Sequence, residues 1–343
     1  MKFLNLFVQE LAVDLGTANT LIMQDDRIVV DEPSIVAIDK KTGETIAVGW
    51  KALQMHEKTH RSIETVRPLK DGVIADFNAA ESMIQGMIGM IGSKRRFFTH
   101  LKMVICIPSG ITEVEKRAVF ESADHVDSKE TYLIHEPMAA ALGIGLDVEE
   151  PIGNMIIDIG GGTTEIAVIA LSGIVCDQSI RVAGNEFTED IIDYMRREHN
   201  LLIGERTAES IKINAGAAIP DIENKPEPYA VNGRDLMSGI PRQIVVGHEE
   251  IAGALNKSIM KIEEAILKAL EITPPELSSD IYKTGLYLTG GGALLRGLDK
   301  RLSIKTKLPV IVAPDPLRAV VKGTGIALKN TQRFSFLIDR KSV

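Results

Sequence analysis

The stretch VDLGTANTLI, residues 13–22, decides the fold because a second version of it, IDIGGGTTEI, occupies residues 157–166. In both versions an apolar strand ends in an aspartate, Asp14 or Asp158, and a turn rich in Gly and Thr leads into a second apolar strand. Two such matching stretches indicate an internal duplication of one domain type. The sequence therefore predicts two related domains, which its length of 343 residues also favours.

Each turn has the composition of a phosphate-binding loop. Glycines let backbone N–H groups converge on an anion, and neighbouring Thr or Asn side chains add donors. Asp14 and Asp158 would repel phosphate directly, but each can hold Mg²⁺ through water, and Mg²⁺ bridges phosphate oxygens. One such turn alone is more often a plain hairpin. Two turns with matching aspartates favour a site for phosphates and Mg²⁺.

Apolar periodicity elsewhere alternates strands and helices, which is typical of an α/β fold. A capping box of Thr112 and Glu115 is expected to open one helix. A third glycine turn, 289–293, is expected to open another helix near Leu294, where N–H groups and the helix dipole suit phosphate or adenosine. Strands are predicted over 11–14, 20–23, 29–40, 45–49, 102–108, 154–158, 164–170 and 286–288, and helices over 79–91, 112–122 and 250–271.

Composition argues against several classes of protein. Lys and Arg number 39 and Asp and Glu 47, so the formal net charge of −8 argues against a general nucleic-acid binder. Cys106 and Cys176 lie in apolar runs, so neither a disulfide framework nor a Cys-based metal site is expected, and the reducing cytoplasm fits. No apolar stretch is long enough to span a membrane, and the N-terminus lacks the cleavage site of a secretory signal.

One metal motif is interpreted as a coincidence. Residues 56–60 read His-Glu-Lys-Thr-His and match the zinc-protease pattern H-E-x-x-H. The surrounding stretch is polar, and no third ligand stands out downstream. A solvated helix face is the preferred interpretation.

Longer strings carry a resemblance to a known family. The match runs from about Leu11 to Leu328 and includes, in order, DLGTANT, DEPSIVA, RPLKDGVIADF, IPSGIT, EPMAAALG, DIGGGTTE, HNLLIGERTAE and LTGGGALLRGL. They resemble the actin-fold ATPase superfamily shared by actin, sugar kinases and heat-shock chaperones, and within it the MreB family of bacterial actins.

The resemblance implies a duplicated actin-like fold of class α/β. It has two domains around a nucleotide cleft, each with a mixed sheet flanked by helices and an inserted subdomain. The first domain is expected over 1–144 with about 315–330, and the second over 145–314. The insertions are expected over about 31–67 and 181–243, and residues 331–343 form a tail outside the resemblance, either a contact site or a frayed end.

The resemblance also implies roles for residues around ATP or ADP and Mg²⁺. Glu136 matches the position that orients the attacking water, with Thr163 assisting at the γ-phosphate; alternatively, Glu136 only complements a helix N-terminus. The phosphate loops are Gly16, Thr17, Ala18 and Asn19, and Gly160, Gly161, Gly162 and Thr163. The adenosine side is Glu209, Ser210, Ile211 and Lys212, together with Gly290, Gly291, Gly292 and Ala293.

The function implied is that of a cytoskeletal protein with slow ATPase activity coupled to polymerisation. Relatives form paired protofilaments on the inner face of the cell membrane and, with membrane proteins of the cell-wall synthesis machinery, maintain rod shape. A sugar-kinase-like phosphotransferase is the alternative, although no motif for a sugar site stands out. A chaperone is disfavoured because too few residues follow the last matched helix for a peptide-binding domain.

Two segments are expected to contact the membrane. Phe3, Leu4 and Phe7 share one face of a short amphipathic helix, and Phe97 and Phe98 follow three basic residues. Core packing is the alternative for Phe97 and Phe98.

Overall fold

The computed structural model describes residues 8–92 and 100–340, so Phe3, Leu4, Phe7, Phe97 and Phe98 lie outside the described residues. The chain divides into two compact units. The first unit comprises Met1–Pro151, Ile169–Ile174 and Leu317–Val343, and the second comprises Ile152–Val168 and Val175–Pro316.

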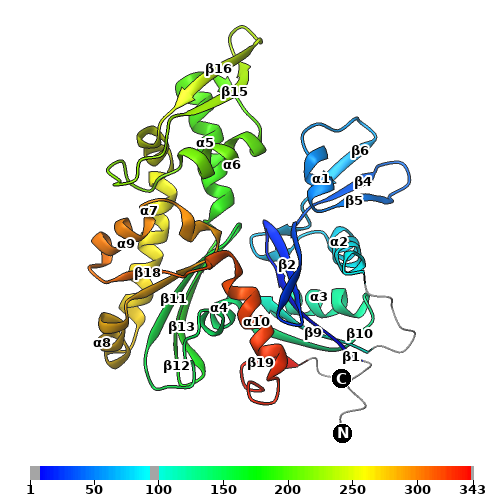
Figure 1. The fold of residues 1–343 in the computed structure, drawn as a ribbon, viewed down its shortest axis with the longest axis vertical. Coiled ribbons are helices and arrows are strands. Elements are labelled where there is room, and N and C mark those ends of the chain that lie inside the picture. Colours follow the sequence, from blue (N-terminus) through cyan, green and yellow to red (C-terminus); the bar gives the residue numbers. More distant parts are fainter. Residues whose placement is uncertain (1–7, 93–99, 341–343) are drawn as a thin grey trace. The chain divides into compact units, whose positions relative to one another are not determined.

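A six-stranded sheet forms the centre of the first unit, in the order β19-β10-β9-β1-β2-β3 (Figure 1). The strands β10, β9 and β1 are parallel, and the other pairings are antiparallel. The strands are β1 (Val8–Leu15), β2 (Asn19–Gln24), β3 (Arg27–Pro33), β9 (His100–Ile107), β10 (Ser128–His135) and β19 (Ile338–Arg340).

Helices cover both faces of this sheet. On one face α2 (Phe77–Met90) and α3 (Glu113–Asp124) bury apolar residues such as Met83 against strand residues such as Ile105. The capping box of Thr112 and Glu115 that opens α3 is confirmed. On the other face α10 (Ala319–Lys329) packs against β1 and β2 and crosses α4 (Glu136–Gly143).

A small inserted sheet, in the order β5-β4-β6, carries its own apolar core with α1 (Trp50–Met55). Because α1 ends at Met55, the H-E-x-x-H residues lie in the turn after the helix, where Glu57 has a φ of 60°. The prediction that residues 56–60 form a solvated helix face is therefore wrong. The strands are β4 (Val36–Asp39), β5 (Thr45–Val48) and β6 (Ile63–Val66), and a separate two-stranded pair consists of β7 (Leu69–Lys70) and β8 (Val73–Ile74).

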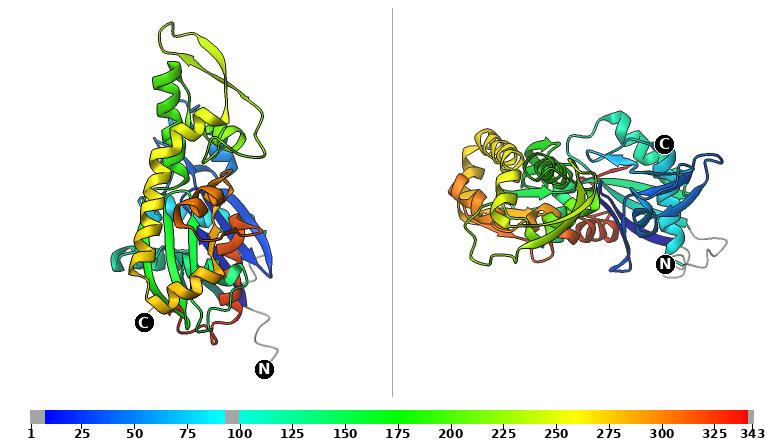
Figure 2. Two further views of the ribbon diagram at one scale, coloured as in Figure 1. Left: turned by 90° about the vertical axis from the view of Figure 1, so that its left-hand side faces the viewer. Right: turned by 90° about the horizontal axis from the view of Figure 1, so that it is seen from above.

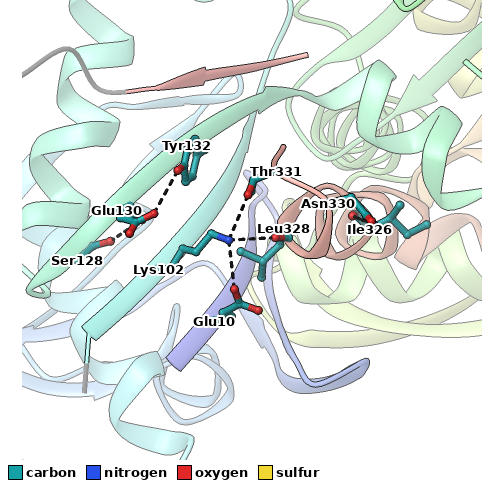
Figure 3. Close-up of polar contacts among 9 residues, drawn as sticks. All are labelled: Glu10, Lys102, Ser128, Glu130, Tyr132, Ile326, Leu328, Asn330 and Thr331. Carbon is teal, nitrogen blue, oxygen red and sulfur yellow. Dashed lines mark hydrogen bonds and ion pairs between the residues drawn. The ribbon is translucent and has the colours of Figure 1, made fainter. Parts of the chain in front are cut away.

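The C-terminal tail is folded over its described length. Phe334 is buried, and β19 pairs with β10 and forms one edge of the sheet. At the start of the tail the Lys102 ammonium on β9 donates to the Leu328 carbonyl at 3.3 Å and to Thr331 Oγ1 at 3.3 Å, and it forms an ion pair with Glu10 at 3.1 Å (Figure 3). This lysine ties β1 and β9 to the end of α10, so residues 331–340 are not a frayed end.

The second unit is built on a five-stranded sheet in the order β13-β12-β11-β17-β18. Its helices bury apolar residues such as Phe187 and Ile259 against strand residues such as Ile157, and α7 runs along the sheet (Figure 2). The strands are β11 (Asn154–Ile159), β12 (Thr164–Ala170), β13 (Gly173–Ile180), β17 (Leu286–Thr289) and β18 (Val310–Val312). The helices are α5 (Gly184–His199), α6 (Glu205–Ala215), α7 (His248–Ile272), α8 (Pro275–Thr284) and α9 (Leu298–Thr306).

A second inserted sheet, in the order β14-β15-β16, belongs to this unit. Its strands are β14 (Leu201–Leu202), β15 (Tyr229–Asp235) and β16 (Pro241–Val246). One prediction for this unit is wrong. The third glycine turn opens a four-residue 3₁₀ helix, Gly291–Leu294, and the next α-helix begins only at Leu298, because Gly297 adopts a φ of +74°.

Candidate functional site

Three candidate groups meet at one edge of the sheet in the first unit. Asp14 lies near the carboxyl end of β1, Cys106 lies opposite it on β9, and Glu136 directly follows β10. Because these three strands are parallel, their carboxyl ends share an edge, which is where open α/β sheets bind ligands. Glu136 is also in the first turn of α4. This position fits the alternative as well, in which Glu136 only complements the N-terminus of a helix.

The Asp14 carboxyl has an unusual environment. Burial raises its pKa from 3.8 to about 6, and a hydrogen bond donated by the Cys106 thiol to Oδ1, 3.2 Å long, acts in the opposite direction. Burial also raises the pKa of the Cys106 thiol, and the negative charges of Asp14 and Glu136 add to this effect. The thiol therefore stays protonated and available as a donor to Asp14.

The first glycine loop is held by two elements that follow it in the chain. Ser34 donates a hydrogen bond to the Gly16 carbonyl at 2.6 Å, and the Gly72 N–H donates to Thr17 Oγ1 at 2.9 Å. A Cβ at Gly16 would lie 2.5 Å from the Asn19 carbonyl oxygen, so the tight turn requires glycine. These contacts fix the conformation of the loop.

The second glycine loop rests against the start of α5. The N–H groups of Gly184 and Asn185 donate to the carbonyls of Gly160 and Gly161 at 3.1 and 2.8 Å. Across the hairpin the Gly160 N–H bonds to the Thr163 carbonyl at 2.9 Å, and Thr163 is buried. This arrangement leaves the conformation of the loop fixed by backbone contacts.

Helix α6 supports the second loop through a lysine. Lys212 Nζ donates to the Gly184 carbonyl at 2.7 Å and to Thr188 Oγ1 at 3.0 Å, and it forms an ion pair with Glu209 at 2.6 Å. These three bonds use the donors of the ammonium group, so Lys212 fixes the start of α5, against which the second loop rests. The Ile211 side chain is fully buried in the core, and a ligand could contact only its backbone. Ser210 donates to the Arg206 carbonyl within α6.

The third glycine turn lies beside the second loop. Thr289 on β17 is in register with Asp158 on β11. Gly290 has a φ of +79°, and a Cβ there would lie 2.3 Å from the Ile159 carbonyl oxygen; a Cβ at Gly292 would lie 2.2 Å from the Ile159 side chain. Neither position accepts a larger residue. Gly291 and Ala293 complete the turn within the 3₁₀ helix.

The predicted residues therefore form one group in each unit. Asp14, Gly16, Thr17, Ala18, Asn19 and Glu136 belong to the first unit, and Asp158, Gly160–Thr163, Glu209–Lys212 and Gly290–Ala293 to the second. The sequence analysis missed Ser34, Gly72, Cys106 and Gly184, which hold the loops or the carboxylate. Of these four residues, only Ser34 and Gly72 lie in strings that carry the resemblance, DEPSIVA and RPLKDGVIADF.

The donor chemistry fits a hydrated magnesium ion. Asp14 in the first unit and Asp158 in the second each supply hard carboxylate oxygens, which Mg²⁺ prefers. Over residues 8–92 and 100–340 no cluster of three or more His, Cys, Asp or Glu side chains forms a metal cage. At either carboxylate, an ion would take most of its ligands from water and phosphate oxygens, as Mg²⁺ commonly does in nucleotide sites.

Comparisons with known proteins agree over nearly the whole chain. Residues 8–335 match the sequence model of the MreB/Mbl protein family. The chain is 46% identical over 329 residues to the cell shape-determining protein Mbl of Bacillus subtilis, covering 96% of this chain and 98% of that protein. It is 47% identical over 333 residues to the cell shape-determining protein MreB of Escherichia coli, covering 96% and 95%.

A solved structure has a similar fold over most of this chain. MreB5 of Spiroplasma citri bound to AMPPNP superposes with a TM-score of 0.90 at 38% identity, covering 95% of this chain and 97% of that chain. The same protein was also solved bound to ADP.

Proposed function

Because this chain belongs to the MreB/Mbl family and has the actin-like fold, we propose that it is an ATP-dependent, filament-forming cytoskeletal protein that maintains rod cell shape. Its filaments lie on the inner face of the cell membrane and organise cell-wall synthesis together with membrane proteins of that machinery. The observation that carries the proposal is the pair of matching aspartate–glycine loops, one in each unit, each held by its own hydrogen bonds.

The two loops bind the phosphates of ATP or ADP, with Asp14 and Asp158 holding Mg²⁺ through water. Support comes from the relative MreB5, which was solved with AMPPNP and with ADP. ATP and ADP differ in the phosphate that these loops would contact, so the two nucleotides can favour different conformations of a subunit. Filament assembly is the output of this switch, with slow hydrolysis by Glu136 and Thr163.

Assembly is tested by sedimentation and electron microscopy of the purified protein. With Mg·ATP and no phosphoryl acceptor, we expect concentration-dependent pelleting and visible paired protofilaments. ATP turnover that requires an added sugar, with no pelleting at any concentration, would instead support a phosphotransferase on the same fold.

Glu136→Gln is expected to lower ATP hydrolysis by about 10²-fold, because an amide cannot accept a proton from the attacking water. Nucleotide binding and pelleting should persist. Glu113→Gln is the matched control, since Glu113 is the first-turn acid of α3 and is exposed. If both substitutions leave hydrolysis unchanged, Glu136 serves only the helix terminus.

Membrane attachment is supported by where the two apolar segments join the sheet. Residue 8 begins β1, residue 100 begins β9, and Val8 and His100 are partners in the parallel pairing. The described chain therefore begins at residue 8 and resumes at residue 100 at neighbouring positions of this sheet. Within the described ranges no helix has the length and apolar character needed to span a bilayer.

Removing residues 1–7 and replacing Phe97 and Phe98 by Ser is expected to lower binding to anionic liposomes by roughly tenfold or more, because buried apolar side chains supply most of such binding. Co-sedimentation with vesicles measures it. Phe336→Ser is the control, since Phe336 is an exposed aromatic of the tail. Equal co-sedimentation of all three proteins would rule out these two segments as the membrane contact.

A further inference from the structure

The Thr289 hydroxyl is a buried polar group at the candidate site with no role so far. Thr289 is the last residue of β17 and has no exposed surface. Among the residues that the structure describes, its Oγ1 has no hydrogen-bond partner. Buried hydroxyls are nearly always bonded, and leaving one without a partner is costly.

Other buried threonines of this chain follow the usual rule. Thr164 Oγ1 donates to the Val182 carbonyl at 2.6 Å, and Thr324 Oγ1 donates to the Val320 carbonyl at 2.8 Å. Both are as fully buried as Thr289. Thr289 therefore differs from these two threonines, whose hydroxyls are bonded to backbone carbonyls.

The position of Thr289 is next to the candidate magnesium carboxylate. Asp158 and Thr289 are register partners on the parallel strands β11 and β17. Their neighbours Ile157 and Leu288 face the apolar core. Since side chains alternate along a strand, Asp158 and Thr289 share the opposite face of the sheet.

The backbone gives Thr289 little freedom to move away. Gly290 has a positive φ, its N–H donates to the Pro316 carbonyl at 2.9 Å, and it packs directly on the Ile159 backbone. The hydroxyl is thus held beside Asp158 by the same turn that forms the third glycine loop.

We propose that Thr289 is a further ligand-positioning residue, whose hydroxyl hydrogen-bonds the hydrated metal–phosphate group that Asp158 holds. This inference rests on the proposed nucleotide binding. A hydroxyl is both donor and acceptor, so it can bond a metal-held water or a phosphate oxygen. In the free protein the hydroxyl would be a buried group without a partner, and in the bound protein it would gain one.

Thr289→Val tests the inference, because valine keeps the shape of threonine and removes the hydroxyl. We expect the melting temperature of the nucleotide-free protein to stay the same or rise. We expect the Kd for Mg·ATP to increase about tenfold, the usual effect of losing one good hydrogen bond. With EDTA in place of Mg²⁺, the difference in ATP affinity should shrink. Thr289→Ser should bind Mg·ATP like the wild type.

Thr324→Val is the matched control, because its hydroxyl is equally buried but bonded within α10. Its Kd for Mg·ATP should equal that of the wild type. Wild-type affinity in Thr289→Val, or a fall in its nucleotide-free melting temperature, would overturn the role of the hydroxyl. Failure of the wild type itself to bind Mg·ATP would instead refute the proposed function.

Discussion

Asp14→Asn is expected to stabilise the nucleotide-free protein above pH 6 and to weaken its binding of Mg·ATP. Burial raises the pKa of Asp14 from 3.8 to about 6. The folded state therefore holds the proton more tightly than the unfolded state, so the contribution of Asp14 to stability is greatest below about pH 4, falls up to about pH 6, and then stays constant. A shift of about 2 pH units corresponds to about 3 kcal/mol at neutral pH. This is an upper value, because Asp14 is only partly buried.

Urea unfolding between pH 4 and 8 measures this effect. The free energy of unfolding of the wild type should fall relative to that of the Asn variant as the pH rises from 4 to 6, and the difference should then stay constant. The amide oxygen of Asn can still accept the Cys106 thiol hydrogen bond, so packing is preserved. Asp193→Asn is the control, since Asp193 is an exposed residue of α5. Identical slopes in wild type and Asp14→Asn would show that Asp14 is not desolvated in the folded state.

Local signals in the sequence were sufficient for much of the fold. The strand predicted over 164–170 is β12, and the helix predicted over 250–271 is α7 extended by a few residues. Both segments have strong periodicity and clear boundaries, and the α/β class and the actin-like fold are confirmed. Long amphipathic helices and hairpins with glycine turns are specified by neighbouring residues, which is why they were predictable.

Tertiary geometry explains the errors. The third glycine turn was expected to open an α-helix, but positive φ values at Gly290 and Gly297 delay α9 to Leu298. For the tail, the sequence leaves a contact site or a frayed end open, and the pairing of β19 with β10 excludes the frayed end over the described residues. Strand pairing over such a separation has no local signal.

The glycine loops of the candidate site could be predicted from the sequence. The residues that hydrogen-bond to these loops could not. Glycines and aspartates stand next to one another in the chain, so the loops could be recognised directly. The bonds from Gly72 to Thr17 and from Lys212 to Gly184 join residues far apart in the sequence. The nucleotide and metal roles of the loop residues stay predictions until binding is measured.

Gly323→Ala and Gly143→Ala are each expected to destabilise the protein by roughly 3 kcal/mol or more, since overpacking against rigid backbone is costly. A Cβ at Gly323 would lie 1.7 Å from the Ala139 carbonyl oxygen, and a Cβ at Gly143 would lie 1.8 Å from the Ala319 carbonyl oxygen. These contacts are between backbones of α4 and α10, so no side chain can move aside. The helices would have to separate.

Gly253→Ala is the control, because Gly253 lies inside α7 and a Cβ there meets nothing within 4 Å. It should gain up to about 1 kcal/mol from the better helix propensity of Ala. Urea unfolding of the three variants measures both effects. Near-wild-type stability of Gly323→Ala would mean that α4 and α10 do not cross as closely as described.

The substitutions at Gly143 and Gly323 also distinguish ATP hydrolysis from ATP binding in the proposed mechanism. Glu136 is the first residue of α4, so separation of α4 from α10 should displace it. The first phosphate loop is held instead by Ser34 and Gly72, neither of which belongs to these helices. Where a variant remains folded at low temperature, ATP hydrolysis should therefore fall more than ATP affinity. Equal losses of both would indicate that α4 also supports the phosphate loop.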